Sequence, residues 1–255
     1  MNAAPYRKEV LQVLSRDLFR GVRTLTQMRI LVTNDDGIEA PGLLELATLA
    51  QEFGEVFVVA PETEQSACGH RITTHRPLTL RPVRANWCAL DGTPADCVRV
   101  ALTEVVPEAA WVFSGINPGG NLGVDIYMSG TVAAAREAAL LGRGAIACSH
   151  YLRRGLPLNW ALARERLRPV IRELLARPRE LGDHWNVNLP HTDHQEVDLP
   201  SVHCARDCSP LPVAFERNMD GTLRYSGNYH ARLHEPETDV ATCFGGHIAI
   251  TLLLP

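Results

Sequence analysis

The stretch RILVTNDDG at residues 29–37 passes from an apolar run directly to two adjacent carboxylates and a glycine. The run predicts a buried β-strand over residues 29–33, because it is too short for a helix and a turn former ends it. Over residues 41–53 apolar side chains recur at intervals of three and four, with Pro41 suited to a first helical turn and Gly54 to a helix end. The order of strand, polar loop and helix is typical of a parallel α/β sheet.

Residues 28–190 repeat this alternation of short apolar runs and helical spacing. Further strands are predicted at 55–60, 111–114, 145–149 and 185–189, and helices at 131–141 and 160–176. Beyond Pro190 prolines, histidines and charges become more frequent and long helical patterns end, which predicts strands, loops and an extended arm. We therefore expect an α/β protein with an open, mostly parallel sheet flanked by helices.

These patterns divide the chain into three parts. Residues 1–27 are interpreted as a nonessential N-terminal extension, residues 28–190 as the catalytic core, and residues 191–255 as C-terminal strands and an arm packed on that core. The basic excess in the extension makes an organellar presequence the alternative. Acidic residues within it, and Met28 immediately before the first strand, favour the extension.

The composition of the chain indicates which partners and which cellular compartment to expect. With 45% hydrophobic residues, 21% charged residues and a net charge of -4, the chain lacks the basic excess that attracts a nucleic-acid polymer. It has neither an apolar run long enough to span a bilayer nor a secretory signal, so we expect no membrane partner. Its seven scattered cysteines are typical of reduced thiols, and we expect a cytoplasmic protein.

Polar loops follow three of the predicted strands, at residues 34–37, 61–66 and 114–117. In open parallel sheets ligands bind beyond the carboxyl ends of the strands, so these loops should meet at one place. Two adjacent carboxylates there need a compensating charge, which a divalent cation would supply. The oxygen-bearing side chains that form a candidate site for Mg²⁺ or Mn²⁺ are those of Asp35, Asp36, Ser66 and Asn117.

The alternative interpretation of residues 35–37 is purely local. Asp and Gly are common turn formers, and an aspartate before a helix often caps it. A turn therefore explains the same residues without a metal, and the sequence pattern taken alone leaves both interpretations open.

A second constellation predicts an anion site. The glycine-rich stretch 117–123 is followed by Ser129-Gly130-Thr131 at the start of the alanine-rich helix. Glycines allow backbone N–H groups to approach a ligand, and a helix N-terminus carries partial positive charge, so phosphate is the expected ligand. An ordinary loop with a Ser/Thr helix cap is the alternative, and residues 91–97 are interpreted as a turn and helix cap of that kind.

Taken together and in order, these segments resemble the SurE family of survival-protein nucleotidases. The matching segments are 29–37, 59–61 with 65–66, 92–98, 114–117 with 121–123, 129–135, and 238–241 with 248–251. The resemblance implies a Rossmann-like core and one divalent metal ion per subunit, held by the four side chains named above. It also implies hydrolysis of nucleoside 5′- and 3′-monophosphates, with short polyphosphate as a further candidate substrate. Homodimers or homotetramers joined through an arm within residues 209–255 are expected.

The hypothesis for the mechanism is attack on the phosphorus by a metal-activated water. The candidate catalytic residues are Asp35, Asp36 and Asn117, and either aspartate is a candidate acceptor for the water's proton. Candidate supporting residues are Asp125, which would orient the loop, and His70. The candidate phosphate-binding residues are Gly37, Asn121, Ser129, Gly130 and Thr131.

Two other functions compete with this hypothesis. One is a sensor that binds a nucleotide without hydrolysing it, against which the set of metal-type oxygens argues. The other is a phosphatase in which Asp35 accepts the phosphoryl group covalently, against which the lack of an Asp-x-Asp pattern argues. Whether His70, His230 or His234 assists catalysis stays open.

Overall fold

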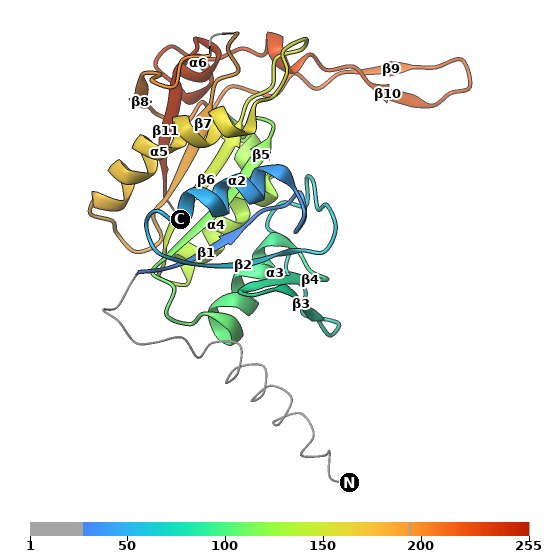
Figure 1. Ribbon diagram of the computed structural model, residues 1–255. Helices are drawn as coiled ribbons and strands as arrows, with labels where there is room; N and C mark the ends of the chain where they lie inside the picture. Colours follow the sequence, from blue (N-terminus) through green and yellow to red (C-terminus); the bar gives the residue numbers. More distant parts are fainter. Residues whose placement is uncertain (1–27, 194, 255) are drawn as a thin grey trace.

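A nine-stranded sheet runs through the part of the chain that the computed structural model describes, residues 28–193 and 195–254 (Figure 1). In order across the sheet, the strands are β3 (Leu80–Arg84), β4 (Trp87–Leu90), β2 (Glu55–Pro61), β1 (Arg29–Thr33), β5 (Trp111–Pro118), β6 (Gly144–His150), β7 (His184–Leu189), β11 (Ile248–Leu253) and β8 (Ser201–His203). Neighbours from β4 to β7 run parallel, whereas β3 and β11 run antiparallel to β4 and β7. The predicted open, mostly parallel α/β sheet is confirmed, and the predicted extension at residues 1–27 lies outside the described residues.

Helices cover both faces of the sheet (Figure 1). On one face α2 (Pro41–Ala50) and α5 (Trp160–Ala176) pack against Ile30 and Val32 of β1. On the other face α3 (Pro94–Val100), the π-helical turn η1 (Ala101–Val105) and α4 (Gly130–Leu140) pack against Leu31. Because alternate residues of a strand point to opposite faces, a strand buried on both sides needs an unbroken apolar run, which β1 has.

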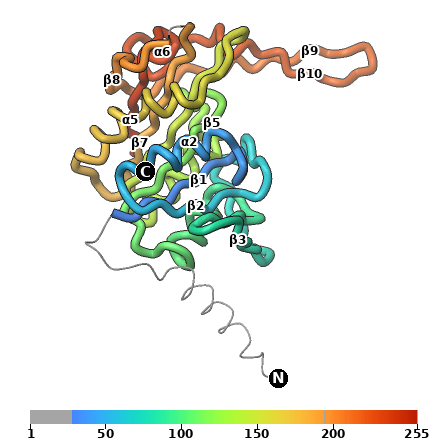
Figure 2. The backbone as a smooth tube through the Cα atoms, in the orientation of Figure 1, coloured from blue at the N-terminus to red at the C-terminus, as the bar shows by residue number. Residues whose placement is uncertain are grey.

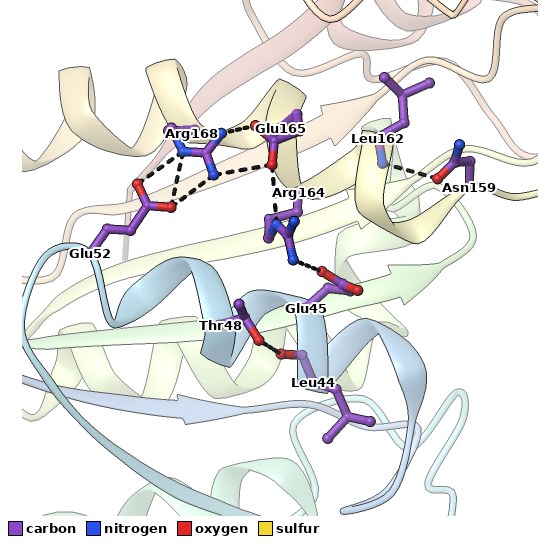
Figure 3. A network of polar contacts seen from close by, with 9 residues as sticks. All are labelled: Leu44, Glu45, Thr48, Glu52, Asn159, Leu162, Arg164, Glu165 and Arg168. Atoms are coloured by element: carbon purple, nitrogen blue, oxygen red, sulfur yellow. Dashed lines mark hydrogen bonds and ion pairs between the residues drawn. The ribbon is translucent and has the colours of Figure 1, made fainter.

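Ion pairs join α5 to α2 and to the turn that follows α2 (Figure 3). Arg164 contacts Glu45 at 2.6 Å and Arg168 contacts Glu52 at 2.8 Å. The Asn159 side chain accepts a hydrogen bond from the backbone N–H of Leu162 and caps the start of α5. Partly exposed ion pairs stabilise little, about 0–1 kcal/mol each, so the apolar face of α5 holds it to the sheet.

Some elements differ from the predicted boundaries. The predicted helix at 41–53 ends at Ala50, because residues 51–53 turn and bring Gly54 against the backbone of Met28. The strand predicted at 111–114 continues to Pro118. Strands β3 and β4 were not predicted, because β3 is an edge strand that is largely exposed and interrupted by a register shift.

The C-terminal segment extends the sheet with β8 and β11 and adds α6 (Asp239–Phe244) and the short turn η3 (Tyr229–Ala231). It also forms a hairpin of β9 (Phe215–Arg217) and β10 (Leu223–Tyr225), all of whose residues are exposed. The hairpin projects from the rest of the molecule (Figures 1 and 2), so the predicted extended arm is present. Of the helices in residues 28–193 and 195–254, none has both the length and the apolarity needed to cross a membrane.

Candidate active site

A tight turn at the carboxyl end of β1 holds the two adjacent aspartates. The Asn34 side chain donates to the carbonyl of Gly37 at 2.9 Å and accepts from its N–H at 3.3 Å. Gly37 has a φ of +106°, a left-handed conformation that glycine adopts without steric cost. The turn expected from residues 35–37 is thus real, and it presents both carboxylates at the carboxyl end of the strand.

Asp35 is buried against the start of α4. Its side chain accepts a hydrogen bond from the Thr131 hydroxyl at 2.5 Å. Burial raises the pKa of Asp35, and hydrogen bonds from the Thr131 side chain and from the backbone N–H groups of Thr131 and Gly130 oppose this rise. A Cβ atom on Gly130 would lie 2.8 Å from the Cβ of Asp35, so the close contact requires glycine. Two of the predicted phosphate-binding residues therefore lie against a predicted metal ligand.

Asp36 has a carboxyl oxygen that no donor satisfies among the described residues. Burial raises its pKa to about 7, with further contributions from repulsion by Asp35 and Glu64. Its Oδ2 atom is buried and has no hydrogen-bond partner among the described residues. A buried carboxylate oxygen without a donor, beside a second carboxylate, is unfavourable unless a proton or cation balances it. The residues present therefore fit a divalent metal ion.

Ser66 lies in the loop after β2, with the backbone N–H of Gln65 bonded to the carbonyl of Asp35 at 2.7 Å. The Ser66 hydroxyl is exposed and donates a hydrogen bond to the Glu64 carboxylate. Glu64 was not among the predicted site residues. Its position two residues before Ser66 in the same polar loop was the only signal for it in the sequence.

Asn117 lies at the end of β5, which is hydrogen-bonded to β1 with Ser114 beside Thr33. Its side chain donates to the carbonyl of Gly119 at 2.9 Å, within its own loop. In residues 28–193 and 195–254, no three His, Cys, Asp or Glu side chains form a group that could hold a metal ion. The two aspartates therefore need neutral oxygen ligands to complete a site, and the roles of Ser66 and Asn117 stay predictions.

Asn121 anchors the glycine-rich loop. Its backbone N–H donates to the Asn188 side chain at 2.8 Å, and its carbonyl accepts from Asn186 and Asn188 at 2.8 and 3.1 Å. The Asn121 side chain donates to Ser149 at 2.8 Å. The two β7 asparagines were not predicted, because they lie 65 and 67 residues from Asn121 in the sequence. The phosphate-binding role of Asn121 stays a prediction.

The segment before α4 is held by side chains from the C-terminal part of the chain. The Asp125 carboxylate accepts hydrogen bonds from the Tyr229 hydroxyl and from Arg232, both at 2.7 Å. Ser129 accepts from the N–H of Val132 at 3.0 Å and thereby caps α4. Asp125 is thus tied to Tyr229 and Arg232, which were not predicted, and its supporting role stays a prediction.

The three histidines left open by the sequence lie in different surroundings. His70 contacts Glu137 at 2.7 Å through Nε2. His230 contacts the Tyr151 hydroxyl at 2.7 Å, and His234 contacts the Arg232 carbonyl at 3.2 Å. These hydrogen bonds assign none of the three to catalysis, which stays open.

Comparison with known proteins agrees with this architecture. The family model described as survival protein SurE matches residues 30–208. A protein of Paramagnetospirillum magneticum named 5′-nucleotidase SurE is 46% identical over 92% of this chain and 93% of its own. One of the same name from Desulforudis audaxviator is 38% identical over 88% of this chain and 90% of its own.

A solved structure gives the same result at the level of the fold. The crystal structure of the SurE protein from Aquifex aeolicus has a TM-score of 0.78 and 29% identity, covering 89% of this chain and 93% of that one. The resemblance stated from the sequence is confirmed. The chain belongs to the SurE family.

Proposed function

We propose that this protein is a 5′-nucleotidase, a phosphoric monoester hydrolase that releases phosphate from nucleoside monophosphates with one bound Mg²⁺ or Mn²⁺ ion per subunit. The observation that carries the proposal is the buried, unpartnered oxygen of Asp36 beside the Asp35 carboxylate. Relatives that are named 5′-nucleotidase and align over most of this chain support the substrate class. Nucleoside 3′-monophosphates and short polyphosphate are further proposed substrates.

The proposed metal site combines Asp35 and Asp36 with the Ser66 hydroxyl and the Asn117 amide oxygen. Such a set of oxygen donors suits Mg²⁺ or Mn²⁺. When bound, the ion would polarise a phosphate oxygen and lower the pKa of a bound water. The Thr131 hydroxyl, which donates to Asp35 at 2.5 Å, would fix the orientation of that carboxylate.

The chain's own groups would bind the phosphate at the same place. The start of α4 faces Asp35, so the partial positive charge of the helix lies beside the proposed metal site. Gly37 and Gly130 lack side chains and would let the phosphate approach the backbone there, with Thr131, Ser129 and Asn121 shaping the flanking segments. A free oxygen of Asp35 or Asp36 would accept the proton of the attacking water.

Phosphate release from AMP tests this proposal. The purified protein should release phosphate with Mn²⁺ or Mg²⁺, lose activity with a chelator and regain it on metal addition. A panel of 5′- and 3′-monophosphates and short polyphosphate would define the substrate range. Binding of AMP without release in every metal tested would overturn the proposal in favour of a sensor, and a phosphoenzyme trapped at Asp35 would replace the mechanism.

The same family membership leads us to propose a homodimer or homotetramer in which the β9–β10 hairpin contacts another subunit. The hairpin supports this because Phe215, Leu223 and Tyr225 are exposed on it, at 58%, 57% and 55% of their surfaces. Contiguous apolar patches on a protein surface often mark protein–protein contact sites.

A further inference from the structure

Glu137 is a buried carboxylate in the second half of α4 that the proposed chemistry does not use. It is 3% exposed and accepts hydrogen bonds from His70 Nε2 at 2.7 Å and from Arg99 Nε at 2.5 Å. Burial alone would raise the pKa of Glu137, but the bonds from His70 and Arg99 hold it below its usual value. Removing a partner from a buried carboxylate leaves a poorly compensated charge in the interior and strongly destabilises the fold. The contact with Glu137 should therefore hold His70 firmly in place.

His70 belongs to the loop of residues 62–73, which carries Ser66 and has no helix or strand of its own. Backbone bonds tie this loop to the site at Gln65 and, through Gly69, to the carbonyl of Met128 at 3.0 Å. Ala67, next to Ser66, has a φ of 55°. A non-glycine residue in this left-handed region costs about 1–2 kcal/mol, so the surroundings must hold the loop in place.

One helix therefore fixes both sides of the proposed metal site. At its first turn α4 holds Asp35 through Thr131, and farther along it holds the Ser66 loop through Glu137. A helix is rigid over this length, so the two attachments keep a constant separation. The second nitrogen of His70, Nδ1, lies 3.4 Å from Arg136 of the same helix, so side chains of α4 contact both nitrogens of the imidazole.

We propose that Glu137 and His70 are positioning residues: Glu137 anchors His70, and His70 holds the 62–73 loop so that the Ser66 hydroxyl faces Asp35 and Asp36. In this assignment His70 transfers no proton. The inference rests on the proposed metal-dependent nucleotidase function, because it gives Ser66 the role of a metal ligand.

The test compares three substitutions of His70 in the full-length protein. In His70→Gln the side-chain amide reaches about as far as Nε2 and still donates to Glu137, whereas His70→Asn is too short and His70→Ala has no donor. Mn²⁺ binding is measured by calorimetry without substrate, and AMP hydrolysis at saturating Mn²⁺. The matched control is His203→Ala, which removes an exposed histidine that contacts Glu173 at 2.7 Å.

If His70 is an anchor, H70N and H70A weaken Mn²⁺ binding about tenfold or more, a typical effect of losing support for a metal ligand. H70Q restores the wild-type dissociation constant, and kcat at saturating Mn²⁺ stays close to wild type in all three. Equal loss of kcat in H70Q and H70A with unchanged Mn²⁺ affinity would overturn the proposal and make His70 a proton-transfer group. Wild-type affinity in H70A would show that no anchor is needed.

Amide hydrogen exchange of residues 62–73 separates this inference from the proposed function. Exchange there should be faster in H70A than in H70Q, even if the wild-type protein binds no Mn²⁺ and releases no phosphate. In that case the nucleotidase proposal fails while the anchor stands. If H70A does not fold, the comparison of H70N with H70Q decides the question, because both keep a polar amide at this position.

Discussion

Two adjacent carboxyl groups lie at the end of β1, and they differ in the hydrogen-bond donors that surround them. Asp35 receives the Thr131 hydroxyl and the start of α4, whereas Asp36 keeps a buried oxygen without a donor among the described residues. The unequal treatment separates two tasks. Asp35 is held in one orientation, and in the proposed metal site the unpartnered oxygen of Asp36 would bind the cation.

Replacing Asp36 should lower the activity and raise the stability of the metal-free protein. We expect Asp36→Asn to lower phosphate release by about a hundredfold or more, because a metal ligand is lost. In chelator at pH 8, the free energy of unfolding should rise by about 1 kcal/mol, because a repelled, part-buried charge is removed. Urea unfolding and an AMP assay measure the two effects. The exposed Asp198→Asn variant is the control, and a less stable D36N protein would contradict the expectation.

Removing the Thr131 hydroxyl should cost both stability and activity. Thr131→Val leaves the buried Asp35 carboxylate without its 2.5 Å donor, for an expected loss of about 1–3 kcal/mol in the free energy of unfolding. Thr131→Ser keeps the hydroxyl and should retain most of the stability and most of the activity. Equal behaviour of the two variants in urea unfolding and AMP hydrolysis would show that the hydroxyl is unimportant.

At the scale of elements, α4 organises the site from its first turn. Gly130 begins the helix although glycine is a poor helix former, and the reason is steric: a Cβ there would lie 2.8 Å from the Cβ and 2.9 Å from Oδ2 of Asp35. The helix start and the strand end thus approach more closely than any side chain at this position allows. The contact between the helix and the strand, and not helix preference, therefore explains the glycine at this position.

The Gly130→Ala variant tests this contact. Alanine usually stabilises a helix by about 0.5–1 kcal/mol relative to glycine. Here we expect lower stability and reduced phosphate release, because Asp35 must move away from the helix. A rise in the free energy of unfolding with unchanged activity would show that the close approach has no functional consequence.

At the scale of the whole molecule, the hairpin is the part that the core does not need. The chain returns close to its starting point, since Ser226 donates a backbone hydrogen bond to Ala214 at 2.9 Å. Replacing residues 215–225 with a short glycine linker should therefore leave the sheet folded. We expect the molar mass in light scattering to fall, with circular dichroism of the core retained. An unchanged assembly would rule out the hairpin as the intersubunit contact.

Buried histidines should make the whole fold sensitive to acid. Burial lowers the pKa of His184 to about 4, so the native state keeps it neutral while the unfolded chain binds a proton below about pH 6.5. Its contribution to stability is therefore complete above pH 6.5 and declines as the pH falls toward 4. At pH 5 the expected loss relative to pH 7.5 is about 2 kcal/mol from His184.

The His184→Gln variant isolates this contribution from other titrating groups. Between pH 7.5 and pH 5, the free energy of unfolding in urea should fall by about 2 kcal/mol more in the wild type than in the variant. An identical pH dependence of the two proteins would mean that His184 titrates normally in the native state.

The sequence alone was enough to predict the elements whose signals are local. The strand at Arg29–Thr33 and the helix at Trp160–Ala176 match their predictions, because apolar spacing and helix caps act over a few residues. It also determined the turn that carries Asp35 and Asp36. The exposed strand β3 has no such apolar pattern and was missed.

Which distant groups contact the site depends on the folded arrangement of strands and helices. Thr131 meets Asp35 across 96 residues, Glu137 meets His70 across 67, and Arg232 meets Asp125 across 107. Spacing along a chain carries information about neighbours in the same element, whereas these contacts depend on how strands are ordered and helices packed. The candidate residues for the chemistry were therefore visible in the sequence, whereas their contacts, and partners such as Glu137 and Arg232, were not.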